Sequence, residues 1–169
     1  MKKTKPQTAK LKTIKLLLLD VDGVMTDGGI YYSQSGEESK KFNIQDGYGI
    51  VKFHRAGMKT GIITGRVSAI VTRRAKELGI EEVFQNLENK FEAYESVKKK
   101  LGLSDDEIAY VGDDEFDLPV LDHVAFSAAP ADAVDAVRKR VDYVCKRRGG
   151  EGAVREVIEL ILRGRNHGR

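Results

Sequence analysis

Short apolar runs alternate along the chain with longer segments of helical periodicity. The first run is Leu16–Leu19, and four consecutive leucines are typical of a strand buried on both faces. In the segment 68–80, apolar residues recur every three or four positions before Gly79 ends the pattern, as in a helix with a glycine cap. By the same criteria, we expect strands over 16–19, 58–65, 81–86, 107–114, 123–128 and 142–145, and helices over 48–57, 68–80, 90–101, 131–140 and 152–162, with one further helical turn near Leu118.

One early segment departs from this alternation. Between residues 29 and 44, aromatic or apolar residues alternate with polar ones around a central SQSGEE, which predicts a β-hairpin with a glycine-containing turn. We expect residues 28–42 to form this hairpin flap. Helices separate the remaining strands, as they must between parallel strands, which need crossover connections. The sequence therefore predicts an α/β fold: a doubly wound parallel sheet with a small β-hairpin flap.

The composition fits one folded domain. Of the 169 residues, 41% are hydrophobic and 33% are charged, which is ordinary for a globular chain long enough to bury a core. We expect a single domain over 1–169, with flexible ends at 1–12 and 163–169, where basic residues gather. Because no aromatic residues lie among these basic ones and the net charge is only +3, nucleic-acid binding is not expected.

The cysteine content and the first apolar run limit the cellular compartments that we expect for the protein. Cys145 is the only cysteine, so an internal disulfide and a cysteine zinc site are both excluded. The apolar run from Ile14 to Leu19 contains Lys15 and ends at aspartates, which is too short for a signal-peptide core or a membrane span. We therefore expect a cytoplasmic protein without a membrane partner.

Polar residues suited to chemistry follow four of the predicted strands. In an open parallel sheet, ligands bind beyond the carboxyl ends of the strands, so a site is expected among the residues directly after them. The residues after any one strand are weak evidence by themselves, but a parallel sheet would gather the residues after all four strands along one edge of the sheet. They are Asp20 and Asp22 after the first strand, Thr64 and Arg66 after the second, Lys90 beyond the third, and Asp113 and Asp114 after the fourth.

Such a cluster predicts phosphoryl transfer. Carboxylates brought this close repel one another unless a cation lies among them, and Mg²⁺ is the usual oxygen-bound ion where phosphate also binds. A lysine and a threonine beside it would hold phosphoryl oxygens. Asp20 and Asp22 are separated by one residue, so in an extended segment both side chains face the same way. One carboxylate can attack phosphorus while the other transfers protons.

In isolation, some of these residues have simpler interpretations. Asp20 and Asp22 could be turn formers after a strand, and Thr64 could be the N-cap of the following helix. A calcium loop of the EF-hand type is excluded, because its fifth and twelfth positions would fall on Val24 and Tyr31.

Several motifs in a fixed order resemble those of a known group of enzymes. DVDG, TGR, a lysine at position 90 and GDDEFDLPVL resemble the haloacid dehalogenase-like phosphatases. More narrowly, DVDGVMTDGGIYY, FNIQDGYGI, ITGR and RRGGEGAVREV are similar to the 3-deoxy-D-manno-octulosonate 8-phosphate phosphatases, small members without a large cap domain. The resemblance implies a phosphorylated eight-carbon keto-sugar acid as substrate, in lipopolysaccharide precursor synthesis. It also implies a homotetramer in which a neighbour's hairpin covers the site.

Carried over by position, the resemblance implies a role for each residue. Asp20 would be the nucleophile, Asp22 the general acid and base, and Lys90 the residue that neutralises charge. The Mg²⁺ ligands would be the carboxylates of Asp20 and Asp113 and the backbone carbonyl of Asp22. Phosphate and substrate would be bound by Thr64, Gly65, Arg66 and Asp46, while Asp114 and Asp117 would orient the metal site.

Two alternatives remain open at this point. Phosphatases of nine-carbon keto-sugar acids share much of the pattern, so the substrate could be a 9-phosphate. The chain could also be a non-catalytic binding module with a phosphatase-like fold, although the intact Asp20, Asp22, Lys90 and Asp113 argue against it.

Overall fold

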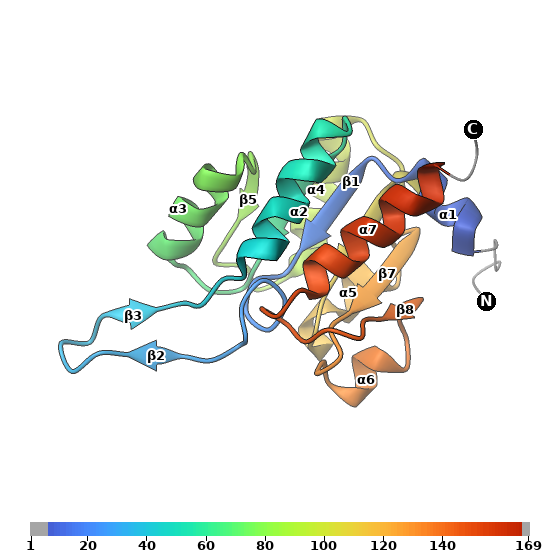
Figure 1. Cartoon of the computed structure of the whole chain (residues 1–169). Coiled ribbons are helices and arrows are strands. Elements are labelled where there is room, and N and C mark those ends of the chain that lie inside the picture. Colours follow the sequence, from blue (N-terminus) through green and yellow to red (C-terminus); the bar gives the residue numbers. More distant parts are fainter. Residues whose placement is uncertain (1–6, 167–169) are drawn as a thin grey trace.

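One six-stranded parallel sheet organises the molecule. The computed structural model describes residues 7–166, and its strand order is β5-β4-β1-β6-β7-β8 (Figure 1). β1 lies at the centre, with Leu19 paired to Ile62 on one side and to Val111 on the other. The strands are β1 (Leu16–Leu19), β4 (Lys59–Ile63), β5 (Glu82–Phe84), β6 (Ile108–Val111), β7 (Phe126–Ala129) and β8 (Tyr143–Val144).

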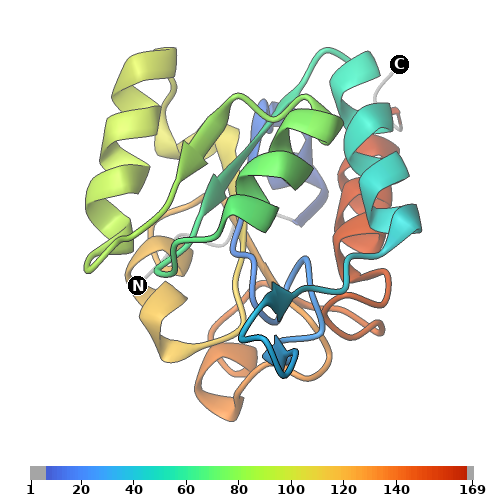
Figure 2. The same ribbon diagram turned by 90° about the vertical axis from the view of Figure 1, so that its left-hand side faces the viewer.

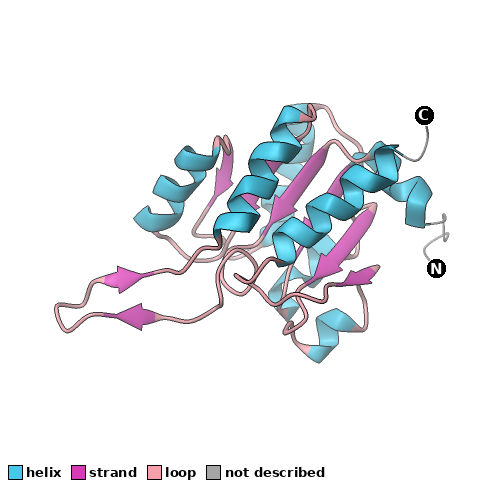
Figure 3. Cartoon of the chain, viewed as in Figure 1, coloured by secondary structure: helices cyan, strands magenta, loops and turns pink. Residues whose placement is uncertain are grey.

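Helices cover both faces of this sheet (Figures 2 and 3). Because side chains alternate along a strand, Leu17 and Leu19 join one buried cluster while Leu16 and Leu18 join the other. The doubly wound α/β fold predicted from the sequence is confirmed. The first cluster is completed by α1 (Gln7–Thr13), α2 (Ile44–Arg55), α3 (Ala69–Leu78) and α7 (Ala153–Asn166), and the second by α4 (Lys90–Leu101), α5 (Leu118–Leu121) and α6 (Asp135–Arg138). Two short 3-10 helices are η1 (Asp105–Glu107) and η2 (Glu115–Asp117).

The flap is an antiparallel hairpin that projects beyond the sheet (Figure 1). It consists of β2 (Tyr31–Tyr32) and β3 (Glu38–Ser39), and an isolated bridge between Thr26 and Phe42 closes its base. Both tyrosines of β2 are exposed. The hairpin falls within the predicted range 28–42, and no large cap domain occurs between residues 7 and 166.

Two helices differ from the predicted ones because of local hydrogen bonds. α2 begins at Ile44 and not near residue 48, since the Asn43 side chain caps it by accepting the N–H of Gln45 at 2.7 Å. α6 has four residues, whereas ten were expected. Upstream of it, the N–H groups of Ala131 and Val134 are bonded to loop carbonyls and not within a helix.

Parts of both ends that were expected to be flexible are helical. Part of the segment 1–12, expected to be flexible, forms α1, and Leu11 is only 2% exposed in the core. At the other end, α7 continues through residue 163 to Asn166. Residues 1–6 and 167–169 of the two predicted flexible ends lie outside the described residues. Within residues 7–166, no helix has the length and apolarity required to span a bilayer.

Candidate active site

The carboxyl ends of β1, β4 and β6 converge on one cleft of about 260 Å³. Asp20 directly follows β1, Thr64 directly follows β4, and Asp113 follows β6 after one glycine. These are neighbouring strands, which explains why residues far apart in sequence meet here. The cleft is lined by Asp20, Asp22, Thr64, Gly65, Arg66, Lys90, Asp113, Asp114, Phe116 and Asp117.

Lys90, the first residue of α4, is the buried cation of the cleft. Its Nζ lies 2.8 Å from Asp20 Oδ1 and 2.6 Å from Asp117 Oδ1, and the side chain is 3% exposed. Burial acts to lower the pKa of Lys90, but the two carboxylates outweigh it and raise that pKa overall. Lys90 is therefore charged and is held next to the predicted nucleophile.

Three carboxylates lie close together beside Lys90. Oxygen atoms of Asp20, Asp113 and Asp117 lie within 4.8 Å of one another. Burial and then repulsion from Asp117 raise the pKa of Asp20 to about 6. Burial, followed by Asp20 and Asp117, raises the pKa of Asp113 to about 8. A divalent cation would relieve this repulsion, so the donor set fits a hard metal ion with oxygen ligands.

Asp117 is less suited to metal binding than its neighbours, because its acceptor positions are already occupied. Oδ1 accepts hydrogen bonds from Lys90 Nζ and, at 2.6 Å, from the Tyr110 hydroxyl. Oδ2 accepts the backbone N–H groups of Asp113 at 2.9 Å and Asp114 at 3.2 Å. Asp117 thus orients Lys90 and the loop after β6, which leaves the side chains of Asp20 and Asp113 for a metal ion.

Gly23 permits the close approach of the loops after β1 and β6. Its φ is +87°, and a Cβ atom at this position would lie 2.1 Å from Asp113 Oδ2. The glycines Gly149 and Gly150 support the same loop from behind. Gly150 donates its N–H to Val24 O at 3.1 Å, and a Cβ on Gly149 would lie 1.8 Å from Gly23 O. Only residues without side chains fit at these contacts.

Asp22 has a different set of partners from Asp20. Lys40 Nζ lies 2.5 Å from its Oδ1, and Arg66 Nη1 lies 3.9 Å from its Oδ2. Arg66 was predicted from the sequence, but Lys40, which directly follows β3, was not. The sequence did contain one indication of this role. Side chains alternate along a hairpin strand, so Glu38 and Lys40 face the same side.

The predicted phosphate ligand Thr64 is buried at 3% exposure and its N–H donates to Phe84 O at 2.9 Å. The alternative interpretation of Thr64 as a helix N-cap is wrong, because Ser68 occupies that position in α3. Across the cleft, the ring of Phe116 lies 5.1 Å from Lys90 Nζ and within 3.1 Å of a Cβ placed on Gly65.

Asp46 is the predicted site residue that the structure does not bring into this cleft. It lies in the first turn of α2, is 3% exposed, and accepts the N–H of Arg155 at 2.7 Å through Oδ1. Burial raises the pKa of Asp46 to about 6. The carboxylate therefore joins the first turn of α2 to the start of α7.

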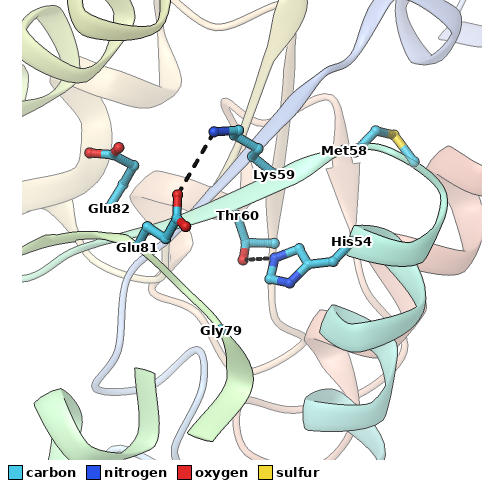
Figure 4. Close-up of a pocket in the computed structure, with 7 residues that line it drawn as sticks. All are labelled: His54, Met58, Lys59, Thr60, Gly79, Glu81 and Glu82. Carbon is cyan, nitrogen blue, oxygen red and sulfur yellow. Dashed lines mark hydrogen bonds and ion pairs between the residues drawn. The ribbon is translucent and has the colours of Figure 1, made fainter. Parts of the chain in front are cut away.

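A second hollow of similar volume lies at the opposite end of β4 (Figure 4). Its polar groups partner one another: His54 Nε2 lies 2.7 Å from Thr60 Oγ1, and Lys59 Nζ lies 3.9 Å from Glu81 Oε2. It lies at the opposite end of the strand from the carboxylates, so it is separate from the cleft after β1.

The chain is similar in sequence to known hydrolases. Residues 79–158 match the haloacid dehalogenase-like hydrolase family. The chain is similar to 3-deoxy-D-manno-octulosonate 8-phosphate phosphatase KdsC of Escherichia coli (strain K12), with 46% identity over 154 residues, covering 91% of this chain and 82% of the relative.

Solved structures of similar proteins extend the comparison. One is 3-deoxy-D-manno-octulosonate 8-phosphate phosphatase from Moraxella catarrhalis in complex with magnesium, phosphate and KDO, with a TM-score of 0.92, 43% identity, and coverage of 95% of this chain and 92% of that one. Another is the cobalt-bound deoxy-D-mannose-octulosonate 8-phosphate phosphatase from Haemophilus influenzae, with a TM-score of 0.90, 39% identity, and coverage of 93% and 92%.

Proposed function

Since the chain belongs to the 3-deoxy-D-manno-octulosonate 8-phosphate phosphatase family of haloacid dehalogenase-like hydrolases, we propose that it hydrolyses this ester to the free sugar acid and inorganic phosphate. The proposed reaction is a step in lipopolysaccharide precursor synthesis. The observation that carries the proposal is the contact of Lys90 with Asp20, beside Asp113, at the carboxyl ends of adjacent strands.

In the first step, Asp20 attacks phosphorus and the bond to the sugar oxygen breaks. Asp22 donates a proton to the departing oxygen, so the sugar leaves as an alcohol and an aspartyl phosphate remains on Asp20. Lys90 and Thr64 bind the phosphoryl oxygens, and the buried position of Lys90 strengthens this contact.

In the second step, Asp22 accepts a proton from water, which attacks the aspartyl phosphate and releases phosphate. We propose Mg²⁺ as the cofactor, held by the carboxylates of Asp20 and Asp113 and the backbone carbonyl of Asp22. When bound, it supplies positive charge to the phosphoryl oxygens of the transition state. Asp117 keeps Lys90 and the loop after β6 in place throughout.

The test of this function is phosphate release from the octulosonate 8-phosphate and from a nonulosonate 9-phosphate, with Mg²⁺ and with EDTA. We expect Mg²⁺-dependent turnover with a higher kcat/KM for the 8-phosphate. A preference for the 9-phosphate would reassign the substrate, and absence of turnover with both would leave a binding module as the alternative.

We also propose that the protein assembles as a homotetramer in which a neighbour's hairpin covers the cleft. A hairpin of two short strands is only marginally stable alone in water. Exposed apolar residues cluster on the flap and at the start of α2, a pattern typical of contact surfaces. They are Ile30, Tyr31, Tyr32, Ile44 and Tyr48, with Ile44 84% exposed. A monomeric mass in solution would contradict this assembly.

The cytoplasm is the compartment we propose for this activity. Cys145 is a buried free thiol, which suits a reducing environment.

A further inference from the structure

Four charged side chains of alternating sign form a closed ring between the flap and the cleft. Lys40 contacts Asp22 at 2.5 Å and Glu38 at 3.5 Å. Glu38 in turn accepts a hydrogen bond from Arg66 Nη2 at 2.7 Å, and Arg66 Nη1 lies 3.9 Å from Asp22. We call Asp22, Lys40, Glu38 and Arg66 the charge ring. It joins the flap to the loops after β1 and β4.

Lys40 is the most buried member of the charge ring, with a side chain only 1% exposed. Burying an ammonium group is costly unless it is paired, and fixing a long lysine side chain costs conformational entropy. Its contacts with Asp22 and Glu38 offset these costs only while the flap and the loop after β1 keep this geometry. The position of the flap and the orientation of Asp22 are therefore coupled.

Each of the two aspartates after β1 thus has its own buried lysine. Lys90 contacts Asp20 and Lys40 contacts Asp22. Lys40 occupies Oδ1 at 2.5 Å, whereas Arg66 Nη1 lies 3.9 Å from Oδ2, which is beyond hydrogen-bond distance. Oδ2 is therefore the oxygen of Asp22 that is available for proton transfer in the cleft. A carboxylate without this contact would rotate about its side-chain bonds and present either oxygen.

We propose that Lys40 is a positioning residue of the proposed phosphatase reaction, holding Asp22 through the charge ring so that Asp22 can protonate the leaving oxygen. The inference rests on the proposed function and adds a residue of the flap to its mechanism. In the step concerned, the bond from phosphorus to the leaving oxygen breaks as the bond to Asp20 forms. The proton passes from Asp22 to the leaving oxygen, and Lys40 itself exchanges none.

The test compares two esters of similar size that differ in their need for protonation. Phenyl phosphate has a poor leaving group and requires an acid, whereas p-nitrophenyl phosphate has a good one and requires little help. In Lys40→Met, we expect kcat/KM for phenyl phosphate to fall on the order of tenfold to a hundredfold, with that for p-nitrophenyl phosphate about unchanged. Lys40→Arg should recover a large part of the loss.

Lys41 supplies the matched control. It is adjacent in the flap, its side chain is 61% exposed, and it lies 3.9 Å from Asp27 and outside the charge ring. Lys41→Met should leave kcat/KM unchanged for both esters. Equal losses for both esters in Lys40→Met, or no loss, would overturn the inference, since a merely structural role does not distinguish leaving groups.

A double-mutant cycle with Asp22→Asn tests whether Lys40 acts through Asp22. With the acid removed, Lys40→Met should cause no further loss on phenyl phosphate. The same fold-loss in both backgrounds would also overturn the inference. Failure of the proposed function would look different, because the unsubstituted protein would then hydrolyse neither ester.

Discussion

Lys90 and Asp117 form a buried ion pair of 2.6 Å between α4 and η2, with side-chain exposures of 3% and 1%. Removing Asp117 would leave both Lys90 and the Tyr110 hydroxyl without this acceptor. We expect Asp117→Ala to lower the free energy of unfolding by about 3 to 5 kcal/mol, as for other broken buried pairs. Urea denaturation measures this loss. Asp114→Ala, which removes an exposed cap of η2, should cost only about 1 kcal/mol.

Asp20→Asn tests the assignment of the nucleophile. The substitution keeps the size of the side chain but replaces the attacking oxygen by an amide, so we expect kcat to fall on the order of a thousandfold or more. The fold should persist, which circular dichroism can check. Activity close to that of the unsubstituted protein would reject the aspartyl-phosphate mechanism.

Lys90→Met tests the assignment of Lys90 as the residue that neutralises charge beside Asp20. We expect loss of most activity on phosphate esters, because no other lysine contacts Asp20 among the described residues. Lys99→Met is the matched control: Lys99 lies on the same helix and is exposed, and its removal should leave kcat unchanged. Steady-state phosphate release compares the two variants, and equal effects would contradict the assignment.

The pH dependence of metal stabilisation follows from the raised pKa values. Without a cation, the folded protein keeps a proton on Asp113 up to about pH 8, whereas the unfolded chain loses it near the ordinary value of 3.8. The folded state binds more protons across this range, so the stability of the metal-free protein falls as pH rises through it. Mg²⁺ competes with these protons.

We therefore expect the gain in Tm on replacing EDTA by Mg²⁺ to be larger at pH 8 than at pH 6. Scanning calorimetry at the two pH values measures it. In Asp113→Asn the gain should shrink at both, because a carboxylate ligand is lost. A gain in the unsubstituted protein that does not depend on pH would show that the metal does not bind at these carboxylates.

Comparing Gly23→Ala with Gly36→Ala separates the effect of a steric clash from the effect of backbone strain. Both Gly23 (φ +87°) and Gly36 (φ +83°) adopt positive φ, so alanine at either position costs about 1 to 2 kcal/mol. Only at Gly23 would the new Cβ meet Asp113, since nothing lies within 4 Å of a Cβ at Gly36. We expect Gly23→Ala to abolish activity and Gly36→Ala to retain it, as phosphate release would show.

The sequence predicted that side chains after three of the strands would meet, because parallel topology gathers strand ends without reference to side-chain detail. Asp20, Thr64 and Asp113 follow β1, β4 and β6, which are neighbours in the sheet. Once those strands were recognised from their apolar runs, the convergence followed. The glycine at the end of α3 was equally accessible, and Gly79 does cap that helix in the left-handed conformation.

Features that depend on contacts between residues far apart in the sequence could not be predicted from the pattern of hydrophobic and polar residues. The burial of Lys40 requires Asp22 on another loop, and its own sequence context, KKF, resembles any exposed basic pair. The contact of Asp46 with the N–H of Arg155 could not be predicted either, because it depends on the packing of α7 beside the first turn of α2, more than 100 residues away in the sequence. α1 was missed since its short, lysine-rich sequence gains its order from packing of Leu11 in the core.

The contact of Gly149 and Gly150 with the loop after β1 also bears on synthesis of the protein. Translation delivers the proposed nucleophile Asp20 about 130 residues before the backbone that supports its loop. A nascent chain that stops before this pair of glycines contains Asp20 and Asp22 but lacks the backbone that packs behind their loop. The proposed site is therefore complete only after Gly149 and Gly150 have left the ribosome and packed behind this loop.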